Sequence, residues 1–200
     1  MKQEDRREQT KRLLLDTTEE LILEQGCSKT TLNDIMQRSG LSKGAIFHYV
    51  SGKDELFAQV LETKLEQKNE NFMKAAGTKE FDGPMNTISS GFAQLENRNN
   101  AANLILMYLI GKSDRPEVAQ IVGKFYTQAV ATSKSWIVTG QNAGVIPAGL
   151  DPDQTAELFE LITFGLRMRS FFGAADSAFG AKEYAGFISG ILQPGHKKED

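Results

Sequence analysis

The 200-residue sequence contains little cysteine, no long hydrophobic run and no convincing stretch of alternating polarity. A single cysteine, Cys27, cannot form a disulfide within the chain, which excludes a disulfide-stapled scaffold. The longest unbroken apolar run, Leu104–Ile110, has seven residues, far below the roughly 18 that a membrane-spanning helix needs. No apolar segment follows the polar N-terminal residues. We therefore expect a protein without a secretory signal that works in the reducing cytosol.

Motifs of the common enzyme classes are also missing. The sequence has no Gly-x-Ser-x-Gly nucleophile motif, no phosphate-binding glycine loop with its lysine, and no cysteine cluster. His48 has no second histidine or cysteine at metal-ligand spacing, and His196 lies in a polar tail. We expect neither an enzyme nor a metal or other cofactor.

The net charge is −3, from 23 basic and 26 acidic residues. Taken alone, this sum argues against a surface devoted to nucleic acid and favours a small-molecule or protein partner. The charge is unevenly distributed, however. Between Met36 and Lys53 the sequence has three basic residues, Arg38, Lys43 and Lys53, and no acidic one.

Helical periodicity dominates the chain, which predicts an all-α fold. Capping residues and glycines divide it into helices. The expected helices span residues 2–25, 31–39, 42–49, 51–73, 84–97, 101–112, 116–139, 151–172 and 179–192, with a linker at 77–84 and a loop at 140–149. The first carries Leu14, Thr18, Leu21 and Ile22 on one stripe and ends at Gly26.

Residues 31–49 have the layout of a helix-turn-helix. Thr31 and Asp34 predict a capping box at the start of its first helix, and Gly40 permits the sharp turn. Ile35 and Ile46 are expected to brace the two helices against each other. The small residues Gly44 and Ala45, after a capping Ser42, would let the second helix approach a major groove closely. A second such pair, Ser51 with Asp54, is expected to cap the helix that follows.

The segment from Thr30 to Phe57, TTLNDIMQRSGLSKGAIFHYVSGKDELF, resembles the DNA-binding domain of the TetR family of bacterial transcriptional regulators. The resemblance covers about the first 60 residues. It implies an all-α homodimer, usually a repressor, that leaves double-stranded operator DNA when a small molecule binds the C-terminal domain. The implied domains are a helix-turn-helix domain at 1–52 and a helical effector-binding and dimerisation domain at 53–200.

Carried over by position, the resemblance assigns DNA contacts to the helix-turn-helix. Thr31 would touch a phosphate, Lys43, Gly44, Ala45 and His48 would face the groove, Tyr49 would lie at its edge, and Lys53 would hold the DNA backbone. Ser42 and Phe47 complete the set of expected DNA-binding residues. Phe47 departs from the family pattern, in which tyrosine is usual, and Val50 stands where phenylalanine is usual. Phe47 lacks a hydroxyl for a phosphate, a loss of about 0.5–1.5 kcal/mol.

Simpler interpretations of these residues stay open. Thr31 could serve only as a helix N-cap and touch no phosphate. Phenylalanine at position 47 is more typical of a core residue than of a DNA contact. The alternative for Lys43 and Lys53 is that they are ordinary solvated surface charges that contact no DNA. Cys27 is expected to pack in the interior, with a redox sensor as the alternative.

The C-terminal part predicts a dimer contact and an effector pocket. A helix over 151–172 that is apolar on several sides must be covered on several sides, by a second copy of the chain or as the centre of a monomeric bundle. Arg167 and Arg169 would pair across that contact or bind an anionic group of a ligand. The expected dimer residues are Leu158, Ile162, Gly165, Arg169, Phe172, Ala181, Tyr184 and Ile188, with Ala174 among the small residues that permit close approach. The expected pocket residues for a largely apolar effector are Met107, Tyr108, Phe125, Trp136, Phe164 and Met168, with core packing as their alternative.

The sequence thus predicts a ligand-responsive transcriptional regulator. The alternative is an all-α interaction module or ligand-binding protein that binds no DNA, which would leave Lys43 and His48 without a role.

Overall fold

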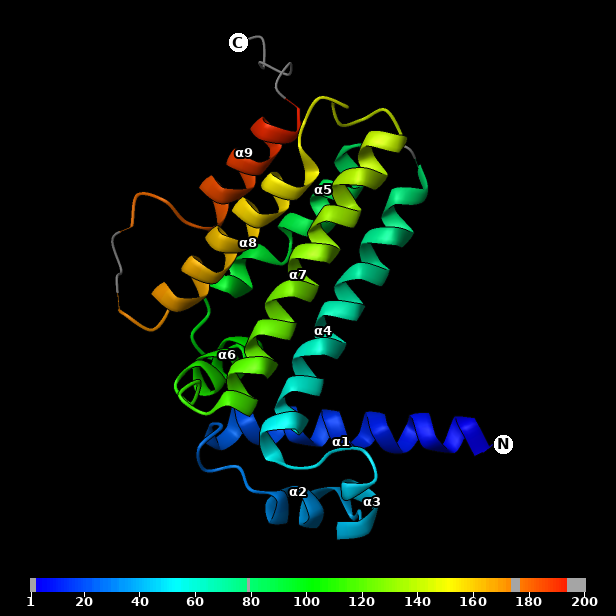
Figure 1. The fold of residues 1–200 in the computed structure, drawn as a ribbon, viewed down its shortest axis with the longest axis vertical. Helices are drawn as coiled ribbons and strands as arrows, with labels where there is room; N and C mark the ends of the chain where they lie inside the picture. The colour runs from blue at the N-terminus through cyan, green and yellow to red at the C-terminus, as the bar shows by residue number, and fades with distance from the viewer. Residues whose placement is uncertain (1–2, 79, 174–176, 194–200) are drawn as a thin grey trace. The chain divides into compact units, whose positions relative to one another are not determined.

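The computed structural model describes residues 3–78, 80–173 and 177–193, and these are helical with no β-strand (Figure 1). The predicted all-α class is confirmed. The α-helices are α1 (Gln3–Gln25), α2 (Leu32–Ser39), α3 (Lys43–Phe47), α4 (Lys53–Ala75), α5 (Asp82–Ser89), α6 (Ala101–Ile110), α7 (Pro116–Asn142), α8 (Pro152–Arg169) and α9 (Ala181–Leu192). Two short 3-10 helices are η1 (Ala76–Thr78) and η2 (Phe92–Leu95). The predicted helix start at Lys2, the small residue Ala174 and the tail with His196 lie outside the described residues.

The chain divides into two compact units. Unit 1 comprises residues 1–64 and 99–125, and unit 2 comprises residues 65–98 and 126–200. Of the three boundaries, one falls within α4, one within α7 and one between η2 and α6. None of the described helices combines the length and apolar character that a membrane span requires.

In unit 1, α1 contacts both α2 and α6. The predicted stripe of α1 is buried: Leu14, Thr18 and Ile22 are fully enclosed, and Leu21 is nearly so. The hydroxyl of Thr18 donates a hydrogen bond to the carbonyl of Leu14 at 2.7 Å, which satisfies this buried polar group within its own helix. The helix ends at Gly26, whose φ of 82° is favourable for glycine.

In unit 2, apolar side chains from α5, η2, α7, α8 and α9 form the core. Its buried members are Met85, Phe92, Leu95, Ile137, Ile146, Ala156, Phe159, Leu166, Tyr184, Ile188 and Leu192. The predicted single helix over 84–97 is wrong. The chain turns after α5 at Ser90 and Gly91 and forms η2, which buries Phe92 and Leu95.

The predicted loop over 140–149 is also partly wrong, because α7 continues to Asn142. Gly140 is helical, and a Cβ atom there would lie 2.5 Å from Cδ1 of the buried Ile146. Glycine is therefore needed at this position for close packing of the following turn. The later helices are shorter than expected, since α8 ends at Arg169 and α9 begins at Ala181.

Candidate nucleic-acid interface

The helix-turn-helix in unit 1 is held by its own caps. Thr31 and Asp34 form the predicted capping box, in which Thr31 Oγ1 accepts from the Asp34 amide at 3.2 Å and Asp34 Oδ2 accepts from the Thr31 amide at 2.8 Å. Gly40 takes the left-handed conformation with a φ of 70°. Ser42 caps α3 by accepting from the Ala45 amide at 3.2 Å. The turn and both helix starts are therefore fixed by local chemistry.

The inner face of the element is apolar. Ile35 of α2 and Ile46 of α3 are buried, as is Val50 immediately after α3. This arrangement supports the bracing role expected of the two isoleucines. The five-residue α3 is too short to be stable by itself, so its orientation depends on this burial.

The outer face of α3 is open to solvent. Lys43, Gly44, Phe47 and His48 are all exposed, while Ala45 is half-buried. The expectation that Phe47 is a core residue is wrong, because 44% of it is exposed and the Lys43 ammonium lies 5.7 Å from its ring centroid. A cap-defined helix therefore presents a cation, a ring and an imidazole on one exposed surface.

Tyr49 lies at the end of this surface. Its ring is half-buried and packs edge-on against His48, with 5.2 Å between ring centroids. Its hydroxyl donates to the carbonyl of Arg7 in α1 at 3.2 Å. Tyr49 thus connects α1 to the segment that follows α3.

The hydroxyl of Thr31 is occupied by the cap. Besides accepting from the Asp34 amide, it donates to Asp34 Oδ2 at 2.7 Å. These hydrogen bonds hold the pKa of the Asp34 carboxyl below its ordinary value. The capping interpretation of Thr31 is confirmed, whereas its phosphate contact stays a prediction.

Lys53 has an internal role that the sequence did not predict. Its Nζ donates to the carbonyls of Cys27 and Thr30 at 2.9 and 2.8 Å, and it lies 5.5 and 5.1 Å from the ring centroids of Phe57 and Tyr108. Two of its three donor hydrogens are therefore engaged within unit 1. The expected contact of Lys53 with the DNA backbone would have to compete with these bonds, and it stays a prediction.

The local positive charge is smaller than the sequence suggests. Arg38 forms a bidentate pair with Glu24 of α1, with nitrogen–oxygen distances of 2.9 and 2.8 Å. Lys53 is held by two carbonyls. Lys43 is consequently the exposed cation of α3 that is best placed to attract a phosphate.

The turn between α3 and α4 is held by side chains from α4. The amide and hydroxyl of Ser51 both donate to Glu55 Oε2 at 2.6 Å, and these bonds lower the pKa of the Glu55 carboxyl. Gln59 Nε2 donates to the carbonyl of Tyr49 at 3.0 Å. The predicted pairing of Ser51 with Asp54 is wrong, because the carboxylate that reaches back lies one residue later.

Asp54 instead joins a network with the start of α7. Its carboxylate accepts from Lys112 at 2.8 and 2.9 Å and from Arg115 at 3.0 Å. Burial opposes the charged form, but the hydrogen bond from Lys112 and the two positive charges outweigh it and lower the pKa of Asp54. The sequence pattern around Asp54 could not predict these partners, because they lie about 60 residues away along the chain.

Cys27 packs in the interior of unit 1, as expected. Its side chain is buried, and burial raises the pKa of its thiol to about 12. The reactive thiolate is therefore scarce at neutral pH, which argues against the redox alternative.

The predicted dimer residues in unit 2 fall into three groups. Tyr184 and Ile188 lie in the unit's own core, 1% and 4% exposed, so this part of the prediction needs correction: their side chains are already covered by their own chain. Arg169 pairs with Glu96 of the same chain at 2.6 Å. The remaining residues are not buried: Ile162 and Ala181 are half-buried, and Leu158, Gly165 and Phe172 are exposed.

The predicted effector residues are divided between the units. Met107, Tyr108 and Phe125 belong to unit 1, and Trp136, Phe164 and Met168 belong to unit 2. Trp136 stacks on Phe72 with 4.8 Å between ring centroids, and Phe164 packs edge-on against Tyr126. A cavity shared by these residues stays a prediction.

Unit 2 also contains two half-buried charges on α8. Burial raises the pKa of the Glu160 carboxyl, whose Oε1 accepts from Ser133 at 2.6 Å, and burial lowers the pKa of the Arg167 guanidinium. Arg167 is thus a half-buried charge rather than a freely exposed one.

Comparison with known proteins supports the interpretation of unit 1. Residues 14–60 match the family described as bacterial regulatory proteins, tetR family. A 63-residue segment is 29% identical to an uncharacterized HTH-type transcriptional regulator, YfiR of Bacillus subtilis (strain 168), and this match spans 32% of the chain and 31% of that protein.

Solved structures resemble the chain over most of its length. A protein of Rhodococcus sp. described as a TetR-family transcriptional regulator has a TM-score of 0.70 and 17% identity, and the match covers 92% of this chain and 98% of that one. A protein of Saccharomonospora viridis, described as a transcriptional regulator in complex with choline, has a TM-score of 0.62 and 17% identity, with coverages of 93% and 96%. At such identities the likeness establishes the fold.

Proposed function

We propose that this chain, whose residues 14–60 match the TetR family of bacterial regulatory proteins, is a regulator of that family that binds operator DNA through α3 and represses transcription until a small molecule releases it. The observation that carries the proposal is the exposed face of α3. Lys43, Phe47 and His48 face solvent from a helix whose other side is buried through Ile46. A short helix held in this way is suited to the major groove.

Each residue of that face has a role in the proposal. Lys43 supplies a positive charge to phosphate or a donor to a base edge, and His48 supplies a further donor. Apart from the adjoining residues and the helix's own backbone, no atom of the described residues lies within 4 Å of the position of a Cβ at Gly44, so the backbone there is open to approach. Phe47 offers apolar contact instead of the hydroxyl that tyrosine would supply.

One α3 reads one half-site, so the proposal includes a homodimer. Support comes from apolar side chains that α8, α9 and the residues after α8 leave in contact with solvent. Leu161 and Phe172 are 58% and 68% exposed, and Leu158 and Phe187 are exposed as well. Isolated exposed apolar residues are ordinary, but several large ones on neighbouring elements favour a protein contact.

The dimer is tested by light scattering after size-exclusion chromatography. We expect the double variant Leu161→Ser, Phe172→Ser to be monomeric where the unmodified protein is dimeric. Leu23→Ser in α1 is the control, because Leu23 is 51% exposed and lies in unit 1. A double variant that stays dimeric would refute this choice of surface.

We also propose that the small molecule binds in unit 2 near the predicted residues Trp136, Phe164 and Met168, through largely apolar contacts. The choline complex of the similar Saccharomonospora viridis protein supports a small-molecule role for this fold. Release then requires that the ligand favour a spacing of the two α3 helices that does not fit successive major grooves.

The DNA-binding proposal is tested by electrophoretic mobility shift with genomic fragments at low salt, followed by competition with unlabelled DNA. We expect a retarded band. An excess of the same fragment without label should abolish this band, and an equal excess of unrelated DNA should not. If dimeric protein retards no fragment, the alternative of a ligand-binding or protein-interaction module without DNA binding is favoured.

A further inference from the structure

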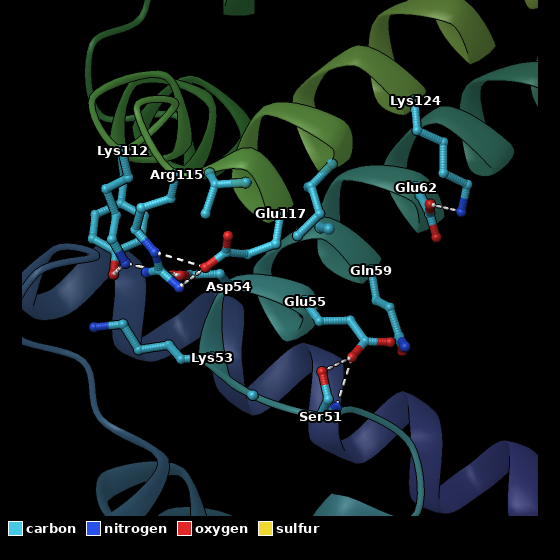
Figure 2. Close-up of a pocket in the computed structure, with 15 residues that line it drawn as sticks. Ser51, Lys53, Asp54, Glu55, Gln59, Glu62, Lys112, Arg115, Glu117 and Lys124 are labelled. Atoms are coloured by element: carbon cyan, nitrogen blue, oxygen red, sulfur yellow. Dashed lines mark hydrogen bonds and ion pairs between the residues drawn. The ribbon is translucent and has the colours of Figure 1, made fainter.

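Unit 1 contains a cavity of about 640 Å³ beside the first turns of α4 (Figure 2). Its lining residues come from the turn before α4, from α4 itself, from the end of α6 and from the first turns of α7. The cavity belongs to neither the proposed DNA contact nor the predicted effector residues, except that Tyr108 reaches one end of it.

One half of the cavity is lined by three cations and two carboxylates, Lys53, Asp54, Lys112, Arg115 and Glu117, and Lys53 is held by the carbonyls of Cys27 and Thr30. Asp54 holds Lys112 and Arg115 at 2.8 and 3.0 Å, and Arg115 also binds Glu117 at 2.6 Å. Figure 2 shows these four side chains gathered together by their ion pairs. With each charged group already paired, this half has little to offer a charged ligand.

The other half has an excess of acceptors. Glu55, Gln59 and Glu62 all line the cavity, and their spacing of i, i+4 and i+7 puts them on one face of α4. Lys124 of α7 is the cation on this side, with its Nζ 2.7 Å from Glu62 Oε1. The Lys124 side chain is 67% exposed, and an exposed pair of this kind exchanges easily. Two carboxylates thus face a single loosely held ammonium.

Gln59 adds an unsatisfied acceptor between the two carboxylates. Its Oε1 is buried and, among the described residues, has no hydrogen-bond donor. Its Nε2 donates to the Tyr49 carbonyl. Buried acceptors are normally satisfied, so a donor group from outside the chain is a natural partner for this atom once the amide turns toward the cavity.

Ala58, Val118 and Ile121 supply apolar lining to the same cavity. Seven residues of helix separate Glu55 from Glu62, a distance of about 10.5 Å at a 1.5 Å rise per residue. The site therefore suits a ligand with a positive charge at each end and an aliphatic middle.

We propose that this cavity binds an aliphatic diamine or polyamine. One ammonium pairs with Glu55, whose Oε1 is not used by the hydrogen bonds from Ser51. The other takes the place of the Lys124 ammonium on Glu62, and the methylene chain packs against Val118 and Ile121. An N–H of the ligand donates to Gln59 Oε1.

One of these side chains connects this site to α3. Gln59 holds the turn after α3 through the Tyr49 carbonyl, so a ligand that turns the Gln59 amide into the cavity breaks this bond and loosens that turn. Ligand binding is therefore expected to lower DNA affinity. This second step rests on the proposed function, whereas the binding site itself does not.

The site is tested by isothermal titration of the full chain in the absence of DNA, with 1,5-diaminopentane and spermidine as ligands and 1-aminopentane as the singly charged control. We expect saturable binding of the two ligands with several charges, and at least about tenfold weaker binding of the monoamine, because one charge-assisted contact is lost. Glu62→Gln should weaken diamine binding about tenfold or more. Glu66→Gln should not, because Glu66 is exposed on α4 and does not line the cavity.

Absence of diamine binding overturns the proposal, as does equal binding by the monoamine or by the Glu62→Gln variant. Mobility-shift assays separate this result from the proposed function. If the protein retards DNA but binds no diamine, the proposed function stands and the proposed site is refuted. If it binds diamine but retards no DNA, the proposed site stands and the proposed function is refuted. Polyamines also bind DNA, so the effect on DNA affinity is measured as the difference between unmodified and Glu62→Gln protein at equal polyamine concentration.

Discussion

The ammonium of Lys53 lies 2.8 Å from the carbonyl oxygen of Thr30, the residue immediately before the N-cap of α2. Lys53 begins α4, so this bond ties the start of one helix to the start of another. A residue whose sequence position suggests a DNA contact thus holds the helix-turn-helix together from within.

Replacement of Lys53 by alanine is expected to destabilise the protein by about 1–3 kcal/mol, because the carbonyls of Cys27 and Thr30 lose a charged donor. The measurement is urea unfolding followed by circular dichroism. Lys29→Ala is the matched control, since Lys29 is exposed in the loop between α1 and α2. Unchanged stability, together with a salt dependence of DNA binding reduced by about one charge, would restore the phosphate role.

Lys43→Ala is expected to weaken DNA binding and to reduce the slope of log K against log salt by about one unit, if the ammonium neutralises one phosphate. The protein should keep its stability, because Lys43 is exposed. Fluorescence anisotropy with a labelled operator over a range of salt concentrations measures both quantities. Lys74→Ala, at an exposed position near the end of α4, should change neither affinity nor slope. Identical titrations for the Lys43 variant would remove this lysine from the interface.

Asp54→Asn is expected to destabilise the protein at neutral pH by about 1–3 kcal/mol, because Lys112 and Arg115 lose their shared anion. The pKa of Asp54 is lowered in the folded state, so its contribution is complete above the unfolded value of about 3.9 and disappears as the pH falls through the folded value. The stability difference between unmodified and variant proteins should therefore begin to shrink at about pH 4 and disappear as the pH falls through the folded-state pKa of Asp54.

Thermal unfolding at several pH values checks this convergence. Glu117→Gln serves as the control, because the Glu117 side chain is 61% exposed and its solvent-screened pair with Arg115 should contribute little to stability. A stability difference for Asp54→Asn that does not vary with pH would show that its charge is not the cause.

Gly140→Ala is expected to destabilise the protein by about 1–3 kcal/mol, because the new Cβ would lie 2.5 Å from Ile146 Cδ1. Gly123→Ala tests the same substitution in the same helix where nothing lies within 4 Å, and should stabilise by up to about 1 kcal/mol. Ile146→Ala should relieve the clash, so the double variant should show less than the sum of the single losses. Additive losses would mean that the two residues do not meet.

Local features were predictable from the sequence and distant pairings were not. The caps of α2 and α3 depend on residues two to four positions apart, so Thr31, Gly40 and Ser42 were enough to define them. The same reasoning failed at Ser51, where Asp54 and Glu55 are both candidates and the choice depends on Lys112 and Arg115.

Side-chain roles also depended on packing that no spacing reveals. Lys53 has the sequence pattern of a surface cation, yet two carbonyls from the loop after α1 bind it. Phe47 is of a residue type common in protein cores, yet it is exposed, and Ile46 is the residue of α3 that is buried. Gly140 lies in a glycine-rich run typical of a loop, but close packing against Ile146 keeps it helical.

Because of the caps of α2 and α3, the conformational entropy of these helices is lost when the chain folds and not when it binds DNA. Because Thr31, Asp34 and Ser42 satisfy the helix starts with groups of the same chain, the helix-turn-helix is ordered when the protein folds rather than when it meets DNA. Association then carries no folding step, and its heat-capacity change should reflect the contact surface alone. The protein meets DNA with its α3 segments already formed, and most of the energy of their contacts is available for discriminating between sequences.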